Sequence, residues 1–315
     1  MAKKDPVKEY LKHFFEQLKK EYHRCYYPGE ECTQMPCSSH SIQNRRILET
    51  LSQDGHVIMP QVTMDRDGLK IGFIRTGVGK ASTFTGLCAR HDNELFRLVD
   101  DCEIDFRNTE QLFLLSYRSV LKGLHACERA AVDMAASYSK ALQLGFIESP
   151  TDTIEQLLSA QQFRKFKSTF DELYMSKQWD GVRHKQFALD AQRPTIAASS
   201  VFPPDVIIDV TKLPTDVAVN IFPIRDKTHI IFSYLRANES QAQKLFGHLD
   251  FADKYLLRYE ISKLILSRCE NFVLSPQIYN TYSERQRETI KNFIMQCHLN
   301  PGIIVDHPDL CLFPD

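Results

Sequence analysis

The chain lacks the features that would place it in or across a membrane. No apolar run approaches the roughly 18 residues that a membrane-spanning helix needs. The first residues, MAKKDPVKEYLKHFF, lack the apolar core of about 7–15 residues that marks a secretory signal. We therefore expect a cytoplasmic protein with no membrane partner.

An excess of charge of one sign is also lacking. The 39 Lys and Arg residues are balanced by 40 Asp and Glu residues, which leaves a formal net charge of −1. A chain with this balance has no general attraction to nucleic acid, so a nucleic-acid partner would need a local basic patch. Several basic residues near the cysteine motifs could form such a patch: Arg45, Arg46, Arg75, Lys80 and Arg90.

Two common enzyme motifs are missing. Gly77-Val-Gly79-Lys80 is no phosphate-binding P-loop, because the position six residues before the lysine is Ile74 rather than glycine. Ser199 and its neighbour lack the G-x-S-x-G elbow of a serine hydrolase. Neither P-loop nucleotide chemistry nor a hydrolase triad is therefore expected.

Cysteines, by contrast, are plentiful. There are nine, and a full disulfide framework needs an even number. In a reducing cytosol, closely spaced Cys and His residues are better explained as metal ligands, and structural zinc sites usually take two close pairs. The pairs Cys32-x4-Cys37 and Cys88-x2-His91 predict one structural Zn²⁺. Cys25, seven residues before Cys32, is an alternative that could replace one of these four ligands.

Periodicity and capping residues predict an α+β fold. Apolar residues at helical spacing predict helices at 5–24, 40–52, 91–100, 109–144 and 151–178. Short apolar stretches predict two or three strands between residues 55 and 84. Runs of β-branched residues from 186 to about 235 predict four or five strands, followed by helices at 237–269 and 282–298.

Two domains are expected from this pattern. Residues 1–180 would form a helical domain that contains a treble-clef-like zinc module at 25–100. Residues 181–315 would form an α+β domain around a mixed, largely antiparallel sheet.

The two cysteine segments resemble parts of the HNH, or ββα-metal, nucleases. CSSHSIQ (37–43) is similar to the family's Cys…His-Ile-x-Pro segment, and CARHDN (88–93) is similar to its Cys-x-x-Cys-His. The likeness covers residues 25–100. In this chain His91 stands for the second structural cysteine, Asp92 for the terminal metal-binding histidine, and Gln43 for the proline.

The resemblance implies a metal-dependent endonuclease. His40 would be the general base that activates water, Asn44 would orient it, and Asp92 would bind a catalytic Mg²⁺ or Mn²⁺. A decayed relative with a purely structural zinc would keep the same residues. If His40 were instead the fourth zinc ligand beside Cys32, Cys37 and Cys88, no base would remain.

A second resemblance spans most of the chain. GKASTFTGLCARHDNELF, QLFLLSYRSV and ENFVLSP are similar to segments of a family of uncharacterised bacterial proteins, which implies no chemistry. It favours a bacterial or phage-related protein, and accessory nucleases of this size often serve defence against phage. We therefore expect a nuclease of an antiviral defence system that acts on DNA or RNA. The alternative is a non-enzymatic, zinc-stabilised interaction or sensor protein that binds a protein partner in a defence assembly.

One further alternative is a ribonuclease motif in the helix predicted at 109–144. Arg118-x6-His125 fits the R-x4-6-H spacing of the HEPN ribonucleases. Arg and His are also ordinary residues on a helix surface, so this short motif is a weak signal.

Overall fold

The computed structural model describes residues 24–29, 32–65, 68–145, 149–203, 216–300 and 305–313. The helix predicted at 5–24 lies outside these residues except for Arg24. The apolar run DVIIDV at 205–210 lies outside them as well.

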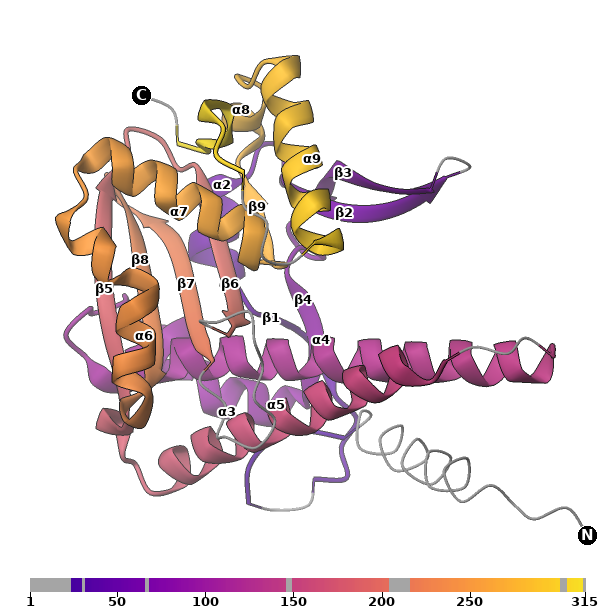
Figure 1. The fold of residues 1–315 in the computed structure, drawn as a ribbon. Coiled ribbons are helices and arrows are strands. Elements are labelled where there is room, and N and C mark those ends of the chain that lie inside the picture. The colour runs from indigo at the N-terminus through magenta and orange to yellow at the C-terminus, as the bar shows by residue number, and fades with distance from the viewer. Residues whose placement is uncertain are drawn as a thin grey trace, which may run out of the picture.

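A seven-stranded sheet forms the centre of the fold, in the order β3-β2-β9-β6-β7-β8-β5 (Figure 1). Neighbouring strands are antiparallel throughout. The strands are β2 (His56–Asp65), β3 (Gly68–Gly77), β5 (Val182–Asp190), β6 (Ile196–Phe202), β7 (Val217–Ile224), β8 (Lys227–Leu235) and β9 (Phe272–Leu274). The α+β class is confirmed, and the sheet is antiparallel rather than mixed.

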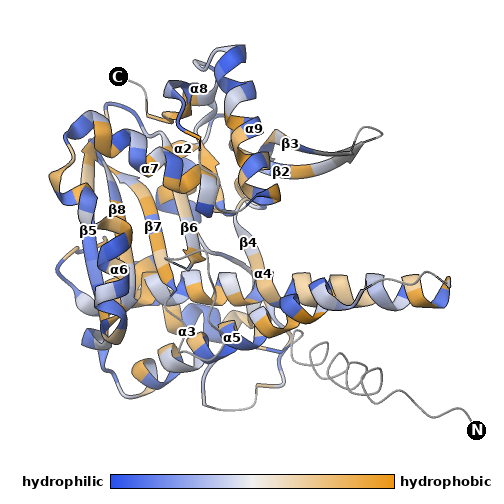
Figure 2. Cartoon of the chain, viewed as in Figure 1, coloured by the Kyte–Doolittle hydropathy of each residue, from blue (hydrophilic) through white to orange (hydrophobic). Residues whose placement is uncertain are grey.

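The two faces of the sheet bury different side chains, because successive residues of a strand point to opposite faces. On β8, Ile230 and Phe232 join the core beneath α6 (Glu239–Phe246) and α7 (Lys254–Arg268), whereas Ile231 joins the core beneath α4 (Thr109–Gln143). Figure 2 shows the resulting run of apolar residues along the central strands. The sheet therefore separates two large hydrophobic cores.

Helix α4 lies across one face of the sheet and continues well beyond it (Figure 1). Its N-cap is Asn108, whose side-chain oxygen accepts hydrogen bonds from the amides of Glu110 and Gln111 at 3.0 and 3.1 Å. Just past its end, Gly145 has a φ of +81°, which glycine adopts without steric cost. The long helix predicted at 109–144 is thus confirmed, and α5 (Thr151–Met175) pairs with it.

Two strands form a second, smaller sheet. Strand β1 (Cys37–His40) pairs with β4 (Thr83–Leu87), and α3 (Ala89–Asp100) follows β4 directly. The helix predicted at 40–52 is present only as η1 (Asn44–Leu48), a π-helical turn, and α2 (Glu49–Leu51). His40 instead ends a strand, because its backbone pairs with Thr83.

Segments between β1 and β4 reach the large sheet, since β2 and β3 belong to it. The large sheet therefore takes strands from both sides of residue 180, and the predicted division there stays a prediction. The remaining elements are η2 (Trp179–Gly181), η3 (Arg236–Asn238), η4 (Gly247–Phe251), α8 (Pro276–Tyr279), α9 (Glu284–Leu299) and η5 (Pro308–Leu310).

Candidate metal centre

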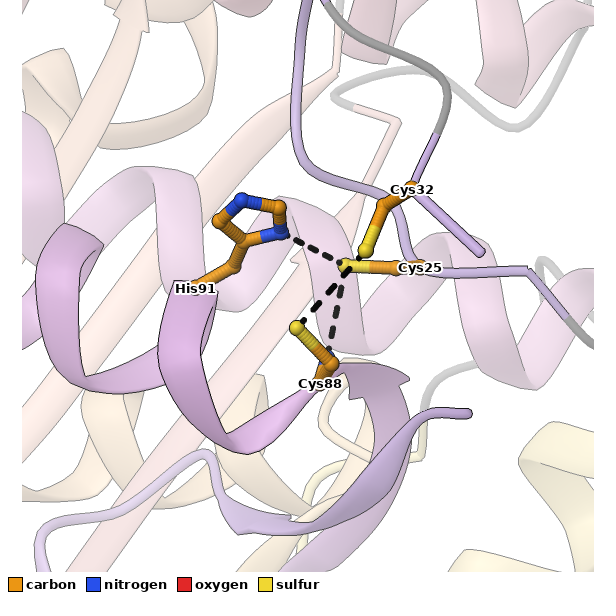
Figure 3. Close-up of side chains that lie close together, drawn as sticks. All are labelled: Cys25, Cys32, Cys88 and His91. Carbon is orange, nitrogen blue, oxygen red and sulfur yellow. Dashed lines mark hydrogen bonds between the residues drawn. The ribbon is translucent and has the colours of Figure 1, made fainter. Parts of the chain in front are cut away.

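Three thiols and one imidazole converge beside the N-terminus of α3. Ligand atoms of Cys25, Cys32, Cys88 and His91 all lie within 4.8 Å of one another (Figure 3). The first two come from the loop before β1. Cys88 is the N-cap of α3, and His91 lies in the first turn of that helix. The tertiary fold thus brings together two segments that are more than fifty residues apart in the sequence.

Two distances within this group are close to those between ligands of a tetrahedral zinc ion. Zn–S bonds of about 2.3 Å at tetrahedral angles separate two sulfur ligands by about 3.8 Å. The sulfurs of Cys32 and Cys88 are 3.8 Å apart, and the Cys25 sulfur is 3.3 Å from Nδ1 of His91. A Cys3His donor set is also one that structural zinc sites use. The four residues could therefore hold a metal ion such as zinc.

The thiols differ in acidity. Burial alone would raise the pKa of Cys88, but hydrogen bonds from the amide of His91, from the thiols of Cys32 and Cys25 and from the amide of Arg90 bring the pKa below its usual value. Burial raises the pKa of Cys25 to about 11. A metal ion binds the thiolate form, so binding here would release protons and would weaken at low pH.

Contacts to helices α4 and α5 hold the loop that carries Cys25. The hydroxyl of Tyr26 donates to the buried carboxylate of Glu128 at 2.8 Å, and Lys167 donates to the Tyr26 carbonyl at 2.6 Å. The amide of Tyr26 donates to the carbonyl of Gly86 at 2.7 Å, next to the end of β4. The ring of Tyr27 stacks on His91 with 3.9 Å between centroids. The residues that follow Cys25 are therefore held by α4 and α5 as well as by β4 and α3.

The structure places three of the four ligands predicted from the sequence in this group. Cys32, Cys88 and His91 belong to the group, and Cys25 stands in it where the sequence analysis favoured Cys37. Cys37 lies on β1, with its sulfur 3.8 Å from the hydroxyl of Ser39. The alternative in which Cys25 replaces one ligand is thus the arrangement that the described residues adopt.

His40 lies outside the metal group: its backbone pairs with Thr83 at the start of β4, whereas Cys88 follows the end of that strand. Its Nδ1 is 2.9 Å from the carbonyl oxygen of Ala81. Because a carbonyl oxygen can only accept, Nδ1 carries the proton and Nε2 is left with its lone pair. Burial lowers the pKa of His40, and the charge of Arg118 lowers it further. The ring is therefore neutral near pH 7.

The carboxylate of Asp92 lies close enough to His40 for each charge to affect the pKa of the other group. Burial raises the pKa of Asp92, against the opposing effects of Arg118 and of a hydrogen bond from Ser39. Asn44, the other predicted catalytic residue, has a buried side-chain oxygen with no hydrogen-bond partner among the described residues. His40 and Asp92 thus interact electrostatically, whereas the Asn44 side-chain oxygen forms no hydrogen bond to any residue in the described part of the chain.

One face of α3 carries Asp92, Phe96 and Asp100 at intervals of four residues, which places them in a row. Arg118 of α4 lies over this row. Its guanidinium is 4.0 Å from the Phe96 ring centroid and donates to both carboxylate oxygens of Asp100, at 2.8 and 2.6 Å. Sequence analysis marked Arg118 only as part of a ribonuclease motif, and Asp100 carried no signal.

The two residues of that ribonuclease motif, Arg118 and His125, form hydrogen bonds with different partners. Arg118 is 3% exposed and is paired with Asp100, whereas Nε2 of His125 is 2.9 Å from the hydroxyl of Thr85. Burial lowers the pKa of His125 to about 4. The two side chains therefore make different contacts along α4.

Comparison with known proteins gives no match to a protein-family model, to a curated protein or to a solved structure. Among the helices in the described ranges, none is both long and apolar enough to cross a bilayer. Function must therefore be inferred from the residues and their arrangement.

Proposed function

We propose that this protein is a metal-dependent nuclease of the HNH type that serves bacterial defence against phage. In this proposal a zinc ion at Cys25, Cys32, Cys88 and His91 is structural, and His40 is the general base. The observation that carries the proposal is the hydrogen bond between Nδ1 of His40 and the carbonyl oxygen of Ala81, 2.9 Å long.

That hydrogen bond supports the role of a base. A histidine that removes a proton from water must be neutral and must offer an unprotonated nitrogen. The bond to Ala81 keeps the proton on Nδ1, so Nε2 can accept one. The lowered pKa of His40, caused first by burial, favours the neutral ring at physiological pH.

Asp92 supports the role of a cation ligand. Carboxylate oxygens are preferred ligands of Mg²⁺ and Mn²⁺, and Mg²⁺ is often held by one or two carboxylates together with substrate phosphate oxygens. Asp100 forms an ion pair with Arg118, whereas Asp92 accepts a hydrogen bond from Ser39, so Asp92 is the carboxylate of this row that we assign to the cation. Such a cation would stabilise the negative charge that develops on a phosphate during attack by water.

The order of elements supports the same proposal. Strand β1 carries His40 and pairs with β4, and α3 carries Asp92. Zinc ligands lie at the junction of β4 and α3, and His91 directly precedes Asp92. A structural zinc ion would thus fix the small sheet and the helix relative to each other, as a precise catalytic site requires.

A nuclease assay tests the proposal. Zinc-loaded protein would be incubated with DNA and with RNA in the presence of Mg²⁺ or Mn²⁺. We expect the wild type to cleave at least one of them. His40→Ala removes the general base and Asp92→Asn removes the cation ligand, so each should reduce the cleavage rate on the order of 10²- to 10⁴-fold. His56→Ala is the matched control, because Nδ1 of His56 also contacts a backbone carbonyl, that of Asp54, at 2.7 Å. Full activity of His40→Ala would refute the role of His40.

A non-enzymatic, zinc-stabilised interaction or sensor protein is the second candidate. The partial burial of both His40 and Asp92 favours it, because a catalytic site must admit a phosphate. In this case the zinc-loaded protein would cleave neither nucleic acid with either cation. His40→Ala would instead lower the midpoint of thermal unfolding, since the contact with Ala81 would then be purely structural.

A further inference from the structure

The buried side-chain amide of Asn271 contacts both chain segments that the His40–Ala81 hydrogen bond joins. The side-chain nitrogen of Asn271, which directly precedes β9, is 2.9 Å from the hydroxyl of Ser41 and 3.4 Å from the hydroxyl of Ser82. Ser41 directly follows His40, and Ser82 directly follows Ala81. Asn271 is thus bonded to the next residue after each partner of that hydrogen bond.

The two serines are also bonded to each other. The hydroxyl and the amide of Ser41 both donate to the carbonyl of Ser82 at 3.0 Å. The amide of Ile42 donates to the hydroxyl of Ser82 at 3.0 Å. Ser82 has a φ of +59°, a conformation that is costly for a residue other than glycine and that needs support from its surroundings. The hydrogen bonds around Ser82 supply that support.

The large sheet holds Asn271 in turn. Its side-chain nitrogen donates to the carbonyl of Ser199 on β6 at 2.8 Å, and its own carbonyl accepts from the amide of Ser199 at 3.1 Å. Asn271, Ser41, Ser82 and Ser199 are all buried. A buried polar group that loses its partner costs free energy, so a network of this kind resists local rearrangement.

We propose that Asn271 is a positioning residue for His40, which transmits the rigidity of the large sheet to the His40 imidazole. It holds the backbone at Ser41 and Ser82 so that Ala81 presents its carbonyl to Nδ1. The proton then stays on Nδ1 and Nε2 stays unprotonated. The inference deepens the proposed function, because it concerns the residue that would act as base, but its test does not require activity.

The test is the tautomer of His40 in the zinc-loaded full chain. Long-range ¹H–¹⁵N correlation spectra distinguish a ring protonated at Nδ1 from one protonated at Nε2, and His40→Gln assigns the signals. We expect a single Nδ1-protonated form in the wild type and an average of both forms in Asn271→Ala. Asn220→Ala is the matched control, because Asn220 is also buried but its side-chain hydrogen bonds are to Leu115 and Ser119.

Each outcome decides the matter. A wild-type tautomer in Asn271→Ala would overturn the inference, and so would an equal change in Asn220→Ala, since that would indicate general loosening. If Asn271→Ala does not fold, Ser41→Ala is judged by the same criteria, because it removes one acceptor and leaves the contact with Ser199. A chain that cleaves no nucleic acid but loses its fixed tautomer in Asn271→Ala would refute the nuclease and retain the positioning role.

Discussion

Nε2 of His91 lies 2.6 Å from the guanidinium of Arg90, while Nδ1 of the same ring faces the sulfur of Cys25. A guanidinium can only donate, so this contact needs an unprotonated Nε2. A metal ion on Nδ1 needs the opposite state, because a neutral imidazole bound through Nδ1 carries its proton on Nε2. Arg90 and a metal ion therefore compete for His91.

Replacing Arg90 should strengthen zinc binding. Arg90→Met removes both the competing hydrogen bond and a positive charge near the cation. Loss of a competing hydrogen bond of about 1 kcal/mol would tighten binding by roughly fivefold. Competition with a chelating dye at pH 7 measures the change. Arg97→Met, an exposed arginine of the same helix, is the control, and weaker binding by Arg90→Met would contradict the prediction.

The ligand set predicts which cysteines matter for metal content. Purified wild-type protein should hold one zinc ion per chain, because the group offers one set of four ligands. Cys25→Ser should lose it, whereas Cys37→Ser should retain it. Elemental analysis of the two variants side by side decides between the two sets. Loss of zinc from Cys37→Ser with retention by Cys25→Ser would restore the set favoured by sequence spacing.

Local patterns predicted most of the helices, because helical periodicity and capping residues are properties of short segments. The extent of α4, from its N-cap at Asn108 to Gly145, is an example. The pattern could not predict β9, which has only three residues. It also could not assign β2 and β3 to the large sheet, since β2 meets β9 through the pairing of Ile58 with Leu274. That contact joins residues more than 200 positions apart.

The candidate site was likewise predictable only where its residues are close in the sequence. Cys88 and His91 were predictable because they are three residues apart at the start of a helix. The choice between Cys25 and Cys37 depends on the path of the loop, which the hydrogen bond from Tyr26 to Gly86 fixes. Arg118, on α4, and Asn271, directly before β9, lie far from the other site residues in the sequence and meet them only in the folded chain. No spacing in the sequence links them to His40.

The pair of Arg118 and Asp100 should respond asymmetrically to mutation. Their side chains are 4% and 37% exposed. Asp100→Asn leaves a buried guanidinium without its ion-pair partner, which should lower the free energy of unfolding by about 3 kcal/mol. Arg118→Met leaves a carboxylate that water can reach, so we expect about 1–2 kcal/mol. Urea unfolding of the zinc-loaded variants measures both values.

An exposed pair supplies the control for that comparison. Arg129 and Asp133 are 60% and 59% exposed and lie one turn apart on α4. Replacing either should change the free energy of unfolding by about 0.5 kcal/mol or less. Equal losses from Asp100→Asn and Arg118→Met would refute the asymmetry.

Because His184 is buried, we expect the protein to lose stability in acid. Its Nδ1 is 2.9 Å from the hydroxyl of Ser233, and its Nε2 is buried with no partner in the described ranges. Burial lowers the pKa of His184 from 6.5 to about 4. The unfolded chain therefore binds a proton at this site at a higher pH than the folded chain does. The contribution of His184 to stability is complete above pH 6.5 and is lost as the pH falls from 6.5 toward 4.

His184→Gln should flatten this dependence. Between pH 7.5 and pH 5, the wild type should lose up to about 2 kcal/mol more of its free energy of unfolding than the variant does. Urea unfolding at the two pH values gives the difference, in which the protons released by metal binding cancel because both proteins share the same ligands. His298→Gln, at an exposed histidine of α9, should lose as much stability as the wild type. Equal pH dependence in His184→Gln and the wild type would mean that His184 titrates alike in the folded and unfolded chains.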